Sequence, residues 1–217
     1  MDRSDSFRER SYLLTVVTPA PTLMANFGDI ITSKVRIKIL ELFFSNLDEM
    51  YHVRGIVREI NEEINAVRRE LKRLEDAGLL KKEGRGNRLY YFVRADHQFF
   101  GDLLSMTAKT RGLGAEIIAN RKKLGKVSFV MFSGRFARAK SGKKEDEVDI
   151  LLVGEVVLPE LANLIRVEES KRGKEINYTV MSREEFDFRK KRRDPFLLGI
   201  LAGSRVMVIG DEEDLVG

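Results

Sequence analysis

The residues best suited to chemistry lie between positions 132 and 154, in the stretch FSGRFARAKSGKKEDEVDILLVG. An apolar, strand-like segment ends at Phe132, a glycine follows, and Asp149 opens a second apolar segment. Free backbone N–H groups at the start of a helix favour phosphate, so a glycine turn with nearby cations is a candidate anion site. The cations of this stretch are Arg135, Arg138, Lys140, Lys143 and Lys144. Two interpretations are open: a site for phosphate chemistry, or a charged loop that only contacts solvent.

Composition excludes several other kinds of site. The chain has 217 residues, 43% of them apolar, which is enough for two domains with a core each. It has no cysteine, which excludes disulfides and thiolate chemistry. His52 and His97 show no metal-ligand spacing with carboxylates, so no structural metal is expected. The net charge of +5 is modest, so the distribution of charge matters more than its total.

The first 28 residues are predicted to form an arm of uncertain order, because Pro19 and Pro21 interrupt any helix. The segment SYLLTVVTPAP resembles an export signal, but Asp2 and Asp5 occupy its expected basic region, so no signal is predicted. No apolar run reaches membrane-spanning length. We therefore expect a cytoplasmic protein with no membrane contact.

Residues 33 to 78 have the pattern of three helices. Ser33 is predicted to cap the first. RGIVREI and INAVRRELKRLEDAGLL, joined by NEE, predict a helix-turn-helix whose second helix ends at Gly78. The apolar residues of that second helix fall on one arc. The opposite face and its flanks carry Asn65, Arg68, Arg69, Lys72 and Arg73.

The stretch LLKKEGRGNRLYYFV predicts a hairpin that turns from Gly84 to Asn87, with Arg85 and Arg88 at its tip. A further helix follows, and the glycines of RGLG are predicted to mark a domain boundary after residue 112. The bulky residues of this helix are expected to be core or dimer-interface residues: Phe99, Phe100, Leu103 and Met106.

The second half, residues 113–217, is predicted to be an α/β domain. KVSFVMF, VDILLVG, EINYTVM and RVMVIG have strand-like composition, PELANLI and SREEFDFRKK are helical, and PFLLGIL is a further apolar segment. The middle strands lack polar alternation, as expected when both faces of a sheet are covered. The overall prediction is an α+β or α/β chain of two domains.

Residues 33–93 resemble a winged helix-turn-helix of the prokaryotic transcription-regulator type, with VRRELKRLEDAGLL as the most typical part. The resemblance implies a DNA-binding domain over residues 29–112. The charges of this segment also favour DNA binding, because a basic helix can enter the major groove while basic hairpin residues reach phosphates. The alternatives are a solvated charged face and a protein-interaction module.

Residues 126–214 resemble the minimal nucleotidyltransferase domain of the polymerase-beta superfamily, through FSGRFAR, VDILLVG, EINYTVMSREEF and DPFLLGIL. Active members need a Gly-Ser pair, two acids spaced D-x-D and a third acid on a neighbouring strand, which together hold a nucleotide and two Mg²⁺ ions. The glycine matches Gly134 and the two acids match Glu147 and Asp149.

Three departures from this pattern predict a degenerate site. Arg135 replaces the serine, Glu147 is one methylene longer than aspartate, and the third acid corresponds to the neutral Asn177. We therefore expect no catalytic residue, metal or cofactor. Under the alternative interpretation as an enzyme, Glu147 and Asp149 would hold Mg²⁺ and the site would bind a nucleotide.

The sequence thus predicts a homodimeric transcriptional regulator that binds double-stranded DNA. Its second domain would serve sensing or assembly, with a nucleotide or another anion as a possible ligand. The alternatives are an active nucleotidyltransferase that modifies a protein or small molecule, for example in a toxin–antitoxin system, and a scaffold.

Overall fold

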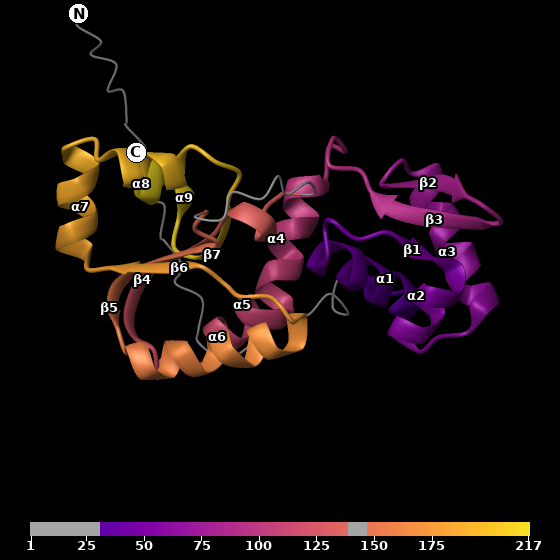
Figure 1. Ribbon diagram of the computed structural model, residues 1–217, viewed down its shortest axis with the longest axis horizontal. Coiled ribbons are helices and arrows are strands. Elements are labelled where there is room, and N and C mark those ends of the chain that lie inside the picture. Colours follow the sequence, from indigo (N-terminus) through magenta and orange to yellow (C-terminus); the bar gives the residue numbers. More distant parts are fainter. Residues whose placement is uncertain (1–30, 139–146) are drawn as a thin grey trace, which may run out of the picture.

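The computed structural model describes residues 31–138 and 147–217. It is a mixed α+β structure in which helices surround two small sheets (Figure 1). The predicted N-terminal arm and the loop cations Lys140, Lys143 and Lys144 lie outside the described residues, and only the backbone of Arg135 is described. In the described part of the chain, no helix has both the length and the apolar composition to cross a membrane.

The N-terminal half begins with three helices and a three-stranded sheet. Its elements are α1 (Lys34–Ser45), β1 (Tyr51–His52), α2 (Val53–Ile60), α3 (Ile64–Asp76), β2 (Leu80–Arg85) and β3 (Arg88–Val93). The predicted cap of α1 is confirmed, since the Ser33 hydroxyl accepts a hydrogen bond from the Arg36 amide. The strands are antiparallel in the order β1-β3-β2. Val67 and Leu71 of α3 are fully buried in the same core as Phe43 of α1.

The hairpin turn is shorter than predicted. Arg85 and Arg88 are the last paired residues, and Gly84 lies within β2, so only Gly86 and Asn87 form the turn. Gly86 has a φ of +60°, which a two-residue hairpin turn requires and glycine adopts without strain. Gly86 is therefore the residue that marks the turn in the sequence, whereas Gly84 belongs to strand β2.

Two helices, α4 (Phe100–Thr110) and α5 (Gly112–Ala119), connect the halves (Figure 1). Helix α5 was not predicted, because the glycines at 112 and 114 were interpreted as a boundary. A Cβ atom at Gly114 would overlap the carbonyl of Ala108, so this glycine permits close packing of α5 on α4. Phe99 is 55% exposed, whereas the Phe100 ring packs on Phe44 with centroids 5.6 Å apart.

The C-terminal half contains a four-stranded sheet and further helices. Its elements are β4 (Gly125–Phe132), a 3₁₀ helix (Gly134–Phe136), β5 (Ile150–Val156), α6 (Leu158–Arg172), β6 (Tyr178–Met181), α7 (Arg183–Lys191), α8 (Pro195–Leu201), β7 (Val206–Ile209) and α9 (Glu212–Val216). The strand order is β6-β5-β4-β7, and only β5 and β6 are parallel, so the sheet is mixed. PFLLGIL forms helix α8, because Asp194 caps it and Pro195 suits a first helical position.

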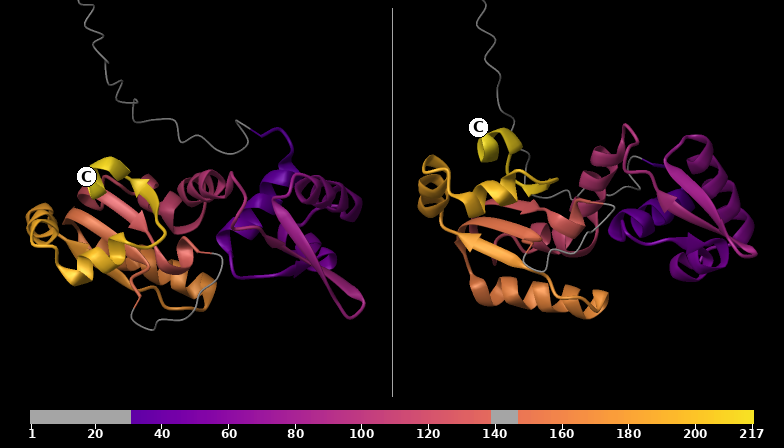
Figure 2. Two further views of the ribbon diagram at one scale, coloured as in Figure 1. Left: turned by 90° about the horizontal axis from the view of Figure 1, so that it is seen from above. Right: turned by 45° about the horizontal axis from the view of Figure 1, so that its top comes forward.

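Helices cover both faces of this sheet, with α6 on one side and α7, α8 and α9 on the other (Figures 1 and 2). Alternate residues of β5 therefore pack into different cores. Ile150 and Leu152 belong to one core, and Leu151 and Val153 belong to the other. The first of these cores continues without a break into the N-terminal half, where it includes Phe44. The two halves thus share buried apolar contacts.

Candidate functional site

The outward face of α3 carries the cations that the sequence assigned to DNA. The predicted set is exposed throughout, while the apolar arc of the helix is buried or half-buried. The exposed residues are Asn65, Arg68, Arg69, Lys72 and Arg73. The helical-wheel prediction of which face of α3 is exposed is therefore confirmed.

These cations differ in whether they already form an ion pair within the protein. The Lys72 ammonium lies 3.0 Å from the Asp76 carboxylate, an exposed pair of little energetic weight. The Arg73 guanidinium lies 2.8 Å from Glu70. Arg68 and Arg69 have no ion pair within the described residues. These two arginines are the cations of α3 most available to an external anion.

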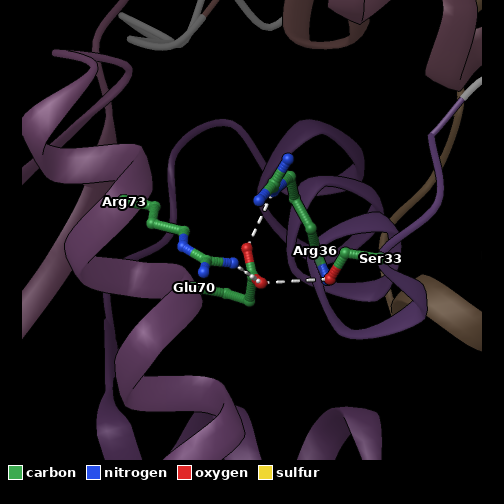
Figure 3. A network of polar contacts seen from close by, with 4 residues as sticks. All are labelled: Ser33, Arg36, Glu70 and Arg73. Carbon is green, nitrogen blue, oxygen red and sulfur yellow. Dashed lines mark hydrogen bonds and ion pairs between the residues drawn. The ribbon is translucent and has the colours of Figure 1, made fainter.

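Glu70, which sequence reasoning missed, joins α3 to α1 (Figure 3). It is only 6% exposed, and its carboxylate accepts hydrogen bonds from the Ser33 hydroxyl, at 3.1 Å, and from Arg36 Nε, at 2.8 Å. Burial alone would raise the pKa of Glu70, but these bonds and the charges of Arg36 and Arg73 leave the pKa below its usual value. The signal was present, since Glu70 falls on the apolar arc three residues after Val67.

The N-terminus of α3 is capped by Glu63, whose two carboxylate oxygens accept hydrogen bonds from the amides of Asn65 and Ala66, each at 2.8 Å. These bonds, followed by the charges of Arg69 and Arg68, lower the pKa of this exposed carboxyl. The end of the helix already holds an anion. Recognition of a further anion would therefore depend on the side chains of α3.

The hairpin adds cations beside this helix. The Arg85 Nε atom lies 3.1 Å from the Glu83 carboxylate, and both side chains are exposed. Arg88 is exposed and has no ion pair in the described ranges. The Lys82 ammonium lies 2.8 Å from Glu75, which attaches β2 to α3.

The second site brings together four of the five positions predicted in the C-terminal half, and the side chain of the fifth, Arg135, lies outside the described part of the structure. Gly134 has a φ of +51°, and a Cβ atom there would lie 2.9 Å from Asp149 Oδ1 and 3.4 Å from Glu147 Cδ. The Asn177 amide donates to Asp149 Oδ2 at 3.0 Å, and its side-chain Nδ2 donates to the Glu147 carbonyl at 3.3 Å. The structure thus brings together residues that the resemblance to nucleotidyltransferases assigned to one site.

Much of the bonding capacity of this cluster is used within the fold. Asp149 is 4% exposed, and its carbonyl accepts a hydrogen bond from the Ser133 amide at 2.8 Å. Ser133, also buried, donates its hydroxyl to the Val148 carbonyl at 2.5 Å. The Arg138 guanidinium forms an ion pair with Glu147. The cluster thus bonds the residues that follow β4 to those at the start of β5.

The donor set fits a two-metal site poorly. Two-metal chemistry requires oxygen ligands on both ions, and Asn177 contributes no charge. Arg138 places a cation on Glu147, one of the two carboxylates. In the part of the chain that the structure describes, no three histidine or carboxylate side chains are placed to share a metal ion.

Comparisons with models of protein families, with curated proteins and with solved structures found no match.

Proposed function

We propose that the protein is a DNA-binding transcriptional regulator in which α1–α3 and the β2–β3 hairpin form a winged helix-turn-helix. The observation that carries this proposal is the exposure of Arg68 and Arg69 on the outward face of α3, without ion pairs in the described residues. An α-helix fits the major groove of B-DNA, and arginine pairs with guanine O6 and N7 through two hydrogen bonds.

The remaining residues of this surface have separate roles in the proposal. Asn65, one helical turn before Arg69, suits an adenine. Lys72 and the hairpin arginines Arg85 and Arg88 contact phosphates. Arg73 is assigned to Glu70, and thus to the fold, more than to DNA. This division revises the sequence prediction, in which all seven residues contacted DNA.

The active species in this proposal is a cytoplasmic homodimer that reads a palindromic site with half-sites about one helical turn apart. The exposed Phe99 ring at the start of α4 supports a contact between copies, because a large apolar side chain at the surface gains free energy when a partner covers it. Sedimentation of the full chain with and without duplex DNA tests the dimer.

A salt titration tests the DNA proposal. Binding of the full chain to labelled duplex DNA is measured from 50 to about 300 mM salt. We expect the logarithm of the affinity to fall linearly with the logarithm of salt, by about 0.9 per phosphate contact. No binding to any duplex at 50 mM salt would contradict the proposal and favour a protein-interaction module.

For the C-terminal half we propose a degenerate nucleotidyltransferase-like domain that serves sensing or assembly. The ion pair between Arg138 and Glu147 supports this, because it neutralises a carboxylate that a metal would need. Incubation with labelled nucleoside triphosphates and Mg²⁺ or Mn²⁺ should show no transfer. Turnover that disappears in Asp149→Asn would instead establish the alternative, an active nucleotidyltransferase.

A further inference from the structure

Helix α1 is attached at its first turn to α3. The Ser33 hydroxyl and the Arg36 guanidinium both bind the buried carboxylate of Glu70 (Figure 3). Glu70 lies in the middle of the helix that the proposed function places in the major groove. A displacement of α3 would therefore be transmitted to the N-terminal end of α1, since close-packed, bonded elements shift together.

The other end of α1 is attached to the C-terminal half. The Arg172 guanidinium, in the last turn of α6, donates to the Ser45 carbonyl at the end of α1 at 3.3 Å. Its Nε atom lies 2.6 Å from the carboxylate of Glu168, which is 5% exposed. The middle of α1 is also bonded, because Arg111 Nε forms an ion pair with Glu41 Oε1 at 2.5 Å.

The same guanidinium contacts the glycine turn of the second site. Its Cζ atom lies 4.5 Å from the centre of the Phe136 ring, a cation–π contact. Phe136 is buried and belongs to the 3₁₀ helix that starts at Gly134, beside Asp149. A cavity of about 30 Å³ adjoins Ser45, Phe136 and Arg172, which is room for one water molecule. One side chain thus touches both α1 and the turn.

We propose that α1 is a strut that couples DNA binding at α3 to the Gly134 turn, with Arg172 as the positioning residue at the junction. This inference rests on the proposed function, since it requires DNA at α3. The helix has 12 residues and spans about 18 Å, with the Glu70 network at its first turn and Arg172 at its last residue. By linkage, an anion that orders the turn changes DNA affinity by the same factor by which DNA changes anion affinity.

Hydrogen exchange of the full chain, with and without saturating duplex DNA, tests the coupling without a known ligand. The amides of Phe136 and Ala137 are bonded to the carbonyls of Ser133 and Gly134, so their exchange reports opening of the turn. We expect DNA to slow exchange in the peptide containing residues 133–138 by at least about fivefold, the lower end of usual couplings.

Two substitutions interrupt the junction in different ways. Arg172→Gln removes the guanidinium, whereas Phe136→Leu removes only the ring beneath it and leaves the Arg172–Glu168 pair. In both variants DNA should bind but should no longer slow exchange of the turn. The control is Arg166→Gln, an equal loss of charge at an exposed position of α6. Exchange in this variant should respond to DNA as in the unaltered protein.

The outcomes separate the two proposals. If the unaltered protein binds no DNA, the proposed function fails. If it binds DNA while exchange of the turn is unchanged, the strut is wrong and the regulator proposal stands. If the response persists in both Arg172→Gln and Phe136→Leu, the coupling does not pass through Arg172, which also overturns the inference.

Discussion

The two candidate sites differ in what their polar groups already contact. On the outward face of α3, Arg68 and Arg69 are exposed and have no ion pair in the described ranges. Around Gly134, Asp149 is buried and bonded to the backbone of Asn177, and Glu147 is paired with Arg138. Groups that are held by the fold mainly stabilise it, whereas unpaired exposed cations can gain free energy from an external anion.

Substitutions at the two sites should therefore differ in their effect on folding stability. Changes at the Gly134 cluster should alter unfolding, and changes at the exposed arginines should alter binding. Changes at Glu70, on the buried side of α3, should likewise alter unfolding.

Gly134→Val should have the largest effect on stability. A β-branched residue at a φ of +51° is strained, and its Cβ would press on the held carboxylate of Asp149. We expect a loss on the order of 3 kcal/mol, measured by denaturant unfolding. Gly199→Ala, at a helical position where a Cβ meets open space, is the control and should be neutral or slightly stabilising. An equally stable Gly134→Val would show that the turn is not structurally constrained.

Glu70→Gln should have the next largest effect. It weakens bonds that join α1 to α3, but Arg36 and Arg73 are partly exposed and can be solvated, which limits the loss to about 1–2 kcal/mol. Thermal unfolding measures it, with Glu116→Gln at an exposed position of α5 as the control. A loss no greater than that of the control would show that the Glu70 network does not stabilise the fold.

The Glu70 contribution should depend on pH in a defined direction. Since the pKa of Glu70 is lower in the folded protein than in the unfolded chain, acid favours unfolding. The contribution is fully present above the unfolded pKa of about 4.3 and disappears as pH falls through the lower folded value. Unfolding free energies of the unaltered protein and Glu70→Gln should therefore converge as the solution is acidified through the folded pKa of Glu70. A difference that does not shrink on acidification would contradict this assignment.

Much of this arrangement could be predicted from the sequence, because it depends on local patterns. The apolar arc of α3 and the cap at Ser33 follow from helical periodicity and capping preference. Helix α5 was missed because Gly112 and Gly114 are poor helix formers, and only the close approach to α4 explains Gly114. The contact of Arg172 with Ser45 joins residues 127 positions apart, and no local pattern contains it.

The smallest effect should come from the hairpin. Arg88→Gln removes an exposed cation with no ion pair in the described residues, so folding stability should be unchanged. If Arg88 contacts one phosphate, the salt slope of DNA binding should fall by about 1, similarly for all sequences. An unchanged slope would restrict the interface to α3.

Two double variants that remove the same charge test whether α3 is the helix that reads DNA. Arg68→Gln with Arg69→Gln acts on the outward face of α3, and Arg166→Gln with Lys171→Gln acts on exposed positions of α6. Each guanine contact is worth about 1–3 kcal/mol, so at fixed low salt the α3 variant should lose at least about tenfold in affinity for the preferred duplex. The α6 variant should change by less than about twofold, since its positions lie away from the proposed interface. Equal affinity losses in the two variants would show that binding follows net charge alone, and would contradict α3 as the DNA-reading helix.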